Sequence, residues 1–304
     1  MKRRSFIQNS VASAGFVGLG GTLLNSCSAF YKKQITILHT NDVHSHIDPF
    51  PTDHAAFPNL GGLARRATLI SQIRKENPNT LLLDAGDIFQ GTPYFNFYGG
   101  ELEFKLMSAL RYDAATIGNH DFDNGVDGLL AQMPYANFDF LSANYDFTNT
   151  VLDGFTSPFK VFMVDGLKVG VFGLGIALEG LVTKKLYKET QYLDPIEIAQ
   201  DMSRVLKQEK KCDLVICLSH LGYEYKNEPQ TPSDMLLASK TEDIDLIIGG
   251  HTHTFLEKPV IRNNRKDIPV LINQVGCYGI NLGRIDFFFD SSKTKSADGI
   301  SITV

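Results

Sequence analysis

The most regular feature of the chain is a short apolar run that ends in polar residues, and this pattern occurs five times. Runs of this length and composition predict buried β-strands, and the glycines that follow several of them predict a break into a loop. The five runs, each with the residues that follow it, are 35–38 with 39–44, 80–84 with 85–87, 114–117 with 118–123, 213–218 with 219–220, and 245–248 with 249–253. Ligands bind at the carboxyl ends of strands in α/β folds, so we expect these polar side chains to share one site.

The densest polar cluster is the segment 118–123, GNHDFD. It brings an amide, an imidazole and two carboxylates together directly after the apolar run 114–117. Polar groups packed so closely at the end of a buried strand are costly unless something satisfies them. A metal ion together with a substrate oxyanion would satisfy them.

Elsewhere apolar residues recur at helical spacing, and the predicted helices alternate with the strands. This favours an α/β fold with a largely parallel core, to which hairpins add antiparallel strands. Helices are predicted at 63–73, 102–111, 125–133 and 195–211, a hairpin at 161–174, and further strands at 138–144, 268–273, 283–289 and 300–304. The sequence shows no short-period repeat or low-complexity linker, which predicts one domain.

Three interpretations concern residues near these elements. His46 lies in the Pro- and Asp-rich segment 46–59, and we expect it to be a solvated loop histidine, with a role beside a ligand as the alternative. Arg65 and Arg66 are expected to face solvent, with a phosphate-binding role as the alternative. The segment 92–98, TPYFNFY, predicts an aromatic loop that packs beneath the site or, alternatively, stacks on a base.

The blocks NDVHSH, GDIFQGT, GNHDFD, SHLG and GGHTH occur in this order. Together they resemble the calcineurin-like metallophosphoesterase superfamily, and within it the 5'-nucleotidase family of secreted bacterial and animal enzymes. One block alone would carry little weight, but five in order, each after a strand, are specific. The resemblance spans 35–304 and implies a four-layer α/β/β/α sandwich of two mixed β-sheets flanked by helices. It also implies a phosphoesterase that uses two divalent metal ions.

The resemblance further implies a role for each polar residue. Its metal ligands are Asp42, His44 and His253 for the first metal, Asn119, His220 and His251 for the second, and Asp87 as the bridge. His120 matches the catalytic histidine, which contacts the phosphoryl group or the leaving oxygen, and Asp123 matches the carboxylate that orients it. Asp121 is expected to be structural. Mixed nitrogen and oxygen ligands suit Zn, Mn, Fe or Co better than Ca or Mg, and the sequence does not choose among them.

The charge of the chain argues against a nucleic acid polymer as partner. The net charge is −5, and because residues 1–26 carry Lys2, Arg3 and Arg4 without an acidic residue, the remainder carries about −8. Two divalent metals would nevertheless create an anion site. Their four positive charges, less the two negative charges of Asp42 and Asp87, leave a net charge of about +2 that would bind a phosphate dianion.

The N-terminus resembles an export signal. The segment 2–8, KRRSFIQ, is similar to a twin-arginine signal, and the apolar run 11–24 that follows is too short for a comfortable membrane span. The segment 24–27, LNSC, resembles a bacterial lipobox, which implies cleavage before Cys27 and a lipid on that residue. We therefore expect a signal peptide at 1–26, a tether at 27–34, and an exported protein, periplasmic or at the cell surface, that is anchored only by the lipid. An uncleaved N-terminal anchor, or a chance match, is the alternative.

The remaining cysteines, Cys212, Cys217 and Cys277, are odd in number and are expected to be buried thiols. The expected substrate is a small phosphomonoester, most simply a nucleoside 5'-monophosphate or a related nucleotide. Alternatives are hydrolysis of cyclic nucleotides or of a sulfate ester, or a non-catalytic lipoprotein subunit that binds metal or ligand. Many members of the resembled family have a second, C-terminal domain that grips the nucleobase, and no residues of this sequence can be assigned to it. We therefore expect that either a separately encoded partner supplies the nucleobase pocket or the substrate is smaller or loosely recognised.

Overall fold

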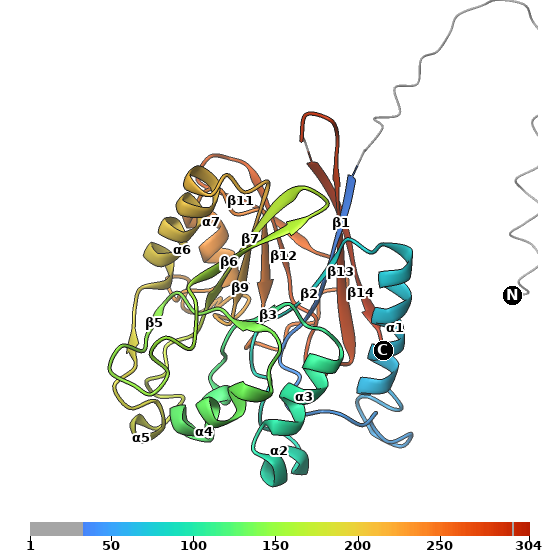
Figure 1. The fold of residues 1–304 in the computed structure, drawn as a ribbon, viewed down its shortest axis with the longest axis vertical. Coiled ribbons are helices and arrows are strands. Elements are labelled where there is room, and N and C mark those ends of the chain that lie inside the picture. The colour runs from blue at the N-terminus through green and yellow to red at the C-terminus, as the bar shows by residue number, and fades with distance from the viewer. Residues whose placement is uncertain (1–32, 294) are drawn as a thin grey trace, which may run out of the picture. The chain divides into compact units, whose positions relative to one another are not determined.

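The computed structural model describes residues 33–293 and 295–304 (Figure 1). The expected signal peptide, Cys27 and residues 27–32 of the expected tether lie outside these ranges. Residues 33 and 34, which the sequence assigned to the tether, begin the first strand, β1 (Lys33–Thr40). Among the helices of the described ranges, none is long and apolar enough to cross a membrane.

Two six-stranded mixed β-sheets pack face to face, with helices outside them, so the predicted four-layer sandwich is confirmed (Figure 1). The first sheet has the order β14-β13-β1-β2-β3-β4, in which β1 to β4 pair in parallel, β13 pairs antiparallel with β1, and β14 pairs antiparallel with β13. Besides β1, its strands are β2 (Thr80–Asp84), β3 (Ala114–Ala115), β4 (Asp139–Phe140), β13 (Asn281–Phe289) and β14 (Lys295–Thr303). The strand predicted at 138–144 is therefore shorter than expected, and the one predicted at 300–304 begins earlier.

The second sheet has the order β11-β12-β10-β9-β7-β6, with a parallel centre and one antiparallel strand at each edge. Its strands are β6 (Phe159–Val164), β7 (Leu167–Leu174), β9 (Leu214–Ser219), β10 (Leu246–Gly249), β11 (Val260–Asn263) and β12 (Pro269–Asn273). The pair β6 and β7 is the predicted hairpin. A small separate sheet pairs β5 (Tyr145–Asp146) with β8 (Gln191–Tyr192).

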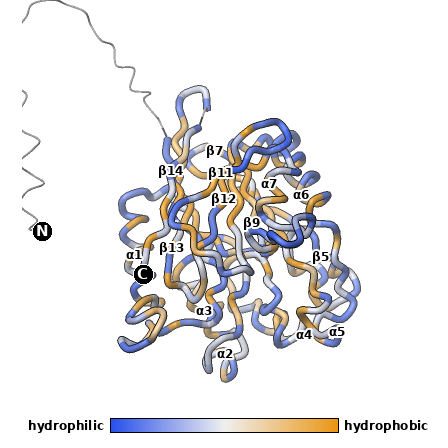
Figure 2. Tube along the Cα trace, turned by 180° about the vertical axis from the view of Figure 1, so that it is seen from behind, coloured by the Kyte–Doolittle hydropathy of each residue, from blue (hydrophilic) through white to orange (hydrophobic). Residues whose placement is uncertain are grey.

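The alternation of side chains along the central strands builds the cores on both faces of each sheet. In β1, Ile35 and Ile37 belong to the core between the sheets, whereas Leu38 packs with the outer helices. In β9, Ile216 faces the first sheet, and Val215 faces the helices behind the second. Strands that are covered on both faces are apolar along their whole length, which explains the clear runs in the sequence. Figure 2 shows these hydrophobic stretches on the inner strands.

Helices cover the outer faces of both sheets. Those on the first sheet are α1 (Leu63–Glu76), α3 (Glu101–Ala109) and α4 (Gly125–Gln132), and those on the second are α6 (Pro195–Arg204) and α7 (Asp234–Lys240). α6 starts sharply because the Asp194 carboxylate accepts hydrogen bonds from two backbone N–H groups of its first turn. It continues as one π-helical turn, so helical backbone ends two residues before the predicted 211.

The prediction of an aromatic loop at 92–98 is wrong. Pro93 starts a short helix, α2 (Pro93–Tyr98), and Gly99, with a φ of 63°, ends it in the left-handed conformation that glycine adopts easily. Phe95 is buried in the core beneath the first sheet, whereas Phe97 is 83% exposed. Only part of the segment therefore packs as expected.

The prediction of solvent exposure for Arg66 is also wrong, and that for His46, which is only partly buried, holds in part. Arg66 is only 2% exposed, because it falls on the inner face of α1, whereas Arg65 is exposed as predicted. His46 packs against Phe50 and Tyr278, with ring centroids 4.9 and 4.4 Å away. The prediction for the cysteines is confirmed, since all three are buried free thiols.

Candidate metal centre

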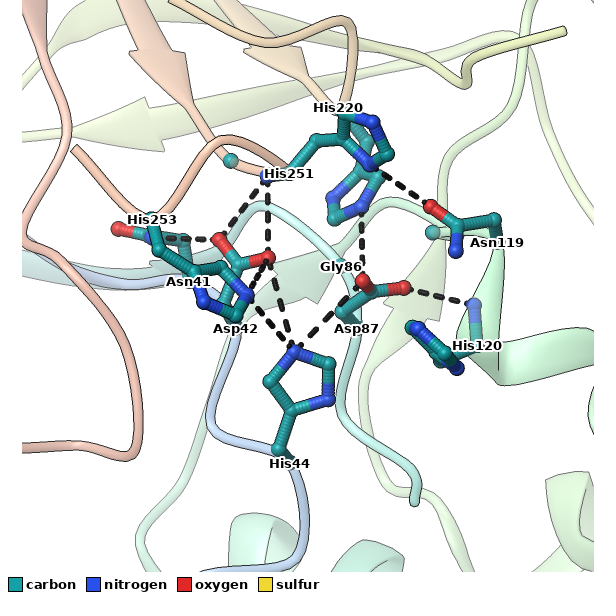
Figure 3. A network of polar contacts seen from close by, with 12 residues as sticks. Asn41, Asp42, His44, Gly86, Asp87, Asn119, His120, His220, His251 and His253 are labelled. Atoms are coloured by element: carbon teal, nitrogen blue, oxygen red, sulfur yellow. Dashed lines mark hydrogen bonds and ion pairs between the residues drawn. The ribbon is translucent and has the colours of Figure 1, made fainter. Parts of the chain in front are cut away.

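The loops that follow five strands meet where the carboxyl edges of the two sheets come together (Figure 3). Each loop delivers residues that the sequence singled out. The loops after β1, β2 and β3 of the first sheet bring Asp42, His44, Asp87, Asn119, His120 and Asp123, and those after β9 and β10 of the second bring His220, His251 and His253. The structure therefore collects all nine predicted residues in one place.

Six of these residues form two adjoining groups that could each hold a metal ion. The members are Asp42, His44 and His253 in the first group, and Asp87, His220 and His251 in the second, with ligand atoms in each group within 4.8 Å of one another. Asn119 joins the second group, because its Oδ1 lies 2.9 Å from Nδ1 of His251. Asp87 lies between the groups: its Oδ2 is 3.1 Å from Nε2 of His220 and 3.8 Å from Nε2 of His44.

Backbone carbonyls orient two of the imidazoles. Nδ1–H of His220 donates to Ala85 O at 2.7 Å, and Nδ1–H of His44 donates to Phe89 O at 3.2 Å. Each ring then turns its Nε2 toward the centre, where it would bind a metal ion in its unprotonated form, as metal-binding histidines do. Nε2 of His220 is buried 3.1 Å from Asp87 Oδ2, and Nε2 of His44 lies 3.0 Å from Nε2 of His253. Buried nitrogen lone pairs beside carboxylate oxygens are the donor set that transition-metal ions such as zinc take, so these residues fit a metal.

The buried carboxylates of the centre favour positively charged groups beside them. Burial alone would raise the pKa of Asp87, but the neighbouring His220 and His44 hold it below the usual value. Burial would lower the pKa of His220, yet Asp87 raises it to about 10. A hydrogen bond to Asp42 likewise raises the pKa of His253 to about 10. Buried carboxylates thus stabilise cations here, whether protons or metals.

The backbone is strained at five of the six residues that form the two groups. A positive φ is uncommon outside glycine and costs on the order of 1–3 kcal/mol, so it persists only where other contacts enforce it. Such contacts exist, since Asp42 N donates to Gly86 O at 2.9 Å and His44 N donates to Asp87 O at 3.0 Å. The residues with positive φ are Asp42, His44, Asp87, His251 and His253, with values of 50°, 50°, 55°, 72° and 51°.

Two glycines allow the loops to approach closely. A Cβ on Gly118 would lie 2.2 Å from Asp87 Oδ1, and a Cβ on Gly250 would lie 2.8 Å from Nδ1 of His220. Both distances are too short for any side chain. Glycine is therefore required at these two positions because a side chain would collide with a residue of the centre, and not only because glycine ends the strand.

Asp121 has the structural role that the sequence predicted. Its carboxylate accepts hydrogen bonds from four backbone N–H groups, which belong to Gly118 at 2.8 Å, Ile88 at 2.9 Å, and Asp87 and Phe89 at 3.1 Å each. The side chain thus fastens the loop after β2 to the loop after β3. The backbone of Asp87 is held by this contact.

Asn41 orients Asp42 and was not assigned a role from the sequence. Its Nδ2 donates to Asp42 Oδ2 and to Gly276 O, both at 2.6 Å, while its Oδ1 accepts from Val275 N at 2.9 Å. The only signal available was its position beside Asp42 in the first block. Its backbone partners lie more than two hundred residues away, so the sequence could not reveal them.

His120 and Asp123 form a pair at the edge of the centre. Nδ1 of His120 lies 3.0 Å from Asp123 Oδ2, and this hydrogen bond raises the pKa of the imidazole. The backbone N–H of His120 donates to Asp87 Oδ1 at 2.8 Å, which fixes the residue beside the second group. The His120 side chain is 38% exposed, and it belongs to neither metal group. It is thus available to a ligand that approaches from solvent.

Two adjoining groups of residues that could each hold a metal ion, with an accessible His–Asp pair beside them, are typical of a class of protein, the metal-dependent hydrolases. The chain matches the calcineurin-like phosphoesterase family over residues 35–255, and it belongs to this family of metal-dependent phosphoester hydrolases.

Individual relatives support the same assignment. The chain is 34% identical over 302 residues to the trifunctional nucleotide phosphoesterase protein YfkN of Bacillus subtilis, which covers 89% of the chain and 19% of that protein. It is 34% identical over 310 residues to the 5'-nucleotidase of Homo sapiens, covering 90% of the chain and 49% of that protein. The crystal structure of the 5'-nucleotidase precursor from Thermus thermophilus superposes with a TM-score of 0.81 at 32% identity, covering 90% of the chain and 55% of that structure. The chain therefore spans about half the length of these relatives or less.

Proposed function

We propose that this protein hydrolyses phosphomonoesters, and that its substrates are nucleoside 5'-monophosphates or related nucleotides. The observation that carries the proposal is the pair of adjoining ligand groups with Asp87 between them and His120 at their open edge. The names of the three relatives support the choice of nucleotides as substrates. The charge of about −8 outside residues 1–26 makes a nucleic acid polymer an unsuitable substrate.

The residues that would hold two divalent metal ions, such as Zn, Mn, Fe or Co, are those of the two groups together with Asn119. Such ions supply the positive charge that neutralises a phosphoryl group and the acidity that activates an attacking water. The protein contributes the geometry. Asp87 reaches toward both groups with one carboxylate oxygen, while its other oxygen holds the backbone of His120.

His120 would act on the phosphoryl group or on the leaving oxygen. With Nδ1–H bonded to Asp123, its Nε2 is free to contact an oxygen of the substrate. A protonated imidazole stabilises negative charge that develops there and can give a proton to the departing oxygen. Asp123 fixes the orientation of the ring and favours its charged form.

Recognition of the nucleobase is the part of the proposal that involves a partner. On the family resemblance alone, we propose that a separately encoded nucleotide-binding domain contributes to the base site. The protein itself is proposed to be exported and lipid-anchored at Cys27, on the strength of the export-signal and lipobox patterns. Palmitate labelling in a bacterial host tests the anchor: the label should be lost in Cys27→Ala and kept in Cys212→Ala.

The activity is tested with protein that starts at Cys27, reconstituted with Mn, Zn or Co. Phosphate release is measured from an aryl phosphate, the nucleoside 5'-monophosphates and a cyclic nucleotide. We expect metal-dependent release that is lost in Asp87→Ala and His120→Ala but retained in two matched controls, Asp53→Ala and His54→Ala. Release from the aryl phosphate alone would indicate that the base site lies on a partner. Full metal binding without hydrolysis of any ester would refute the proposal in favour of a binding subunit.

A further inference from the structure

Arg66 is buried without a partner. Its side chain, on the inner face of α1, forms no hydrogen bond or ion pair with any residue in the described ranges, and both Nε and Nη1 are buried and unsatisfied. The guanidinium packs against the backbone of Gly279, where a Cβ would lie 1.8 Å from Nη1. An arginine side chain keeps its charge inside a protein, and a buried charge without a partner is costly. Something must therefore accept hydrogen bonds from these atoms.

A second unsatisfied group faces the same space. Glu103, on α3, is 5% exposed; its Oε1 accepts a hydrogen bond from the Ser45 hydroxyl, and its Oε2 is buried without a partner. Arg66, Glu103, Ser45, Asp84 and Tyr112 line a cavity of about 20 Å³. A water molecule needs at least about 10–15 Å³ and two to four polar partners. The cavity meets both conditions.

We propose that this cavity is a binding site for one structural water, which accepts a hydrogen bond from Arg66 and donates one to Oε2 of Glu103. A direct ion pair does not replace it, because no carboxylate oxygen of the described residues lies within 4.0 Å of the guanidinium. A halide ion would fit the volume, but it cannot donate a hydrogen bond to Oε2 and would be repelled by the carboxylate. Water satisfies the donor and the acceptor together.

The water completes a connection between a helix and the candidate metal centre. From Arg66 on α1 it reaches Glu103 on α3, and Glu103 holds the hydroxyl of Ser45, the residue after His44. Ser45 N donates to Ile88 O at 2.9 Å, so the same residue also fastens the loop after β2. Through Glu103 and Ser45, the bound water thus stabilises the loops after β1 and β2, which carry residues of the candidate metal centre.

A crystal structure at a resolution that shows ordered waters tests the proposal directly. We expect a single peak within hydrogen-bond distance, about 3 Å, of Arg66 and of Oε2 of Glu103. Crystals soaked in sodium bromide distinguish the occupants, because an anomalous bromide peak at this position would identify an anion site and overturn the proposal. A structure in which Arg66 contacts Glu103 directly would overturn it as well.

Thermal unfolding provides an independent test that needs no crystal. Arg66→Met leaves the carboxylate without its bridge, so we expect Tm to fall by about 4 °C or more, while the exposed neighbour Arg65→Met changes Tm little. Glu103→Met should cost much less in the Arg66→Met background than in the wild type, because the two side chains act through one water. Fully additive losses in Tm would contradict a shared water.

Discussion

Asp121→Asn tests whether the two loops of the candidate centre depend on one carboxylate. In the structure Oδ1 of Asp121 accepts from Ile88 N and Phe89 N, and Oδ2 accepts from Asp87 N and Gly118 N. Asparagine keeps one acceptor oxygen and replaces the other by an NH₂ group, which faces two N–H donors. Two buried donors lose their acceptor, and each costs about 1–3 kcal/mol. We therefore expect the free energy of unfolding to fall by about 2–6 kcal/mol.

The assay is urea unfolding at pH 8, combined with a measurement of bound metal. Burial and the charge of Asp87 raise the pKa of Asp121 to about 7, so the wild-type side chain is a carboxylate at this pH. The matched control is Asp127→Asn on the exposed face of α4, which loses only a surface ion pair with Lys188 and should change stability by less than about 1 kcal/mol. Wild-type stability together with wild-type metal content in Asp121→Asn would refute the argument.

Three further predictions follow from the same geometry. His120→Gln should lower kcat by about 10²–10⁴ with metal content unchanged, whereas Asp87→Ala should lose metal as well as activity, as metal analysis beside the kinetic assay would show. Chelation of metal should lower Tm, and readdition should restore it in the wild type but not in Asp87→Ala. Asp234→Asn should flatten the dependence of stability on pH. Burial raises the pKa of Asp234 to about 8, so the stability it contributes is fully present below about pH 4. That contribution is lost as pH rises toward 8, by at most about 1.4 kcal/mol per pH unit, and urea titrations across this range would reveal an unchanged slope if the reasoning is wrong.

The sequence predicted the strands and the polar residues after them because both signals are local. A strand buried on two faces leaves an apolar run such as 214–218, and the side chains that follow it need no distant information to be recognised. Arg66 shows where this fails. It lies at helical spacing from Ile70 and Ile73, so its place on the buried face of α1 was readable, but the cavity that it lines together with Glu103 of another helix was not. The charge of the Arg66 side chain led to the wrong prediction that it faces solvent.

The placement of the centre also explains why the fold and the candidate chemistry depend on each other. Each candidate metal group takes residues from the loops of both sheets: Asp42 and His44 meet His253 in the first, and Asp87 meets His220 and His251 in the second. The sheets are already joined at this point, since His251 N donates to both oxygens of Asp42 at 3.0 Å. A cation in either group would add bonds across the same junction, so metal binding and the packing of the two sheets stabilise each other. Substitutions in the core between the sheets, far from any ligand, should therefore weaken metal binding as well as folding.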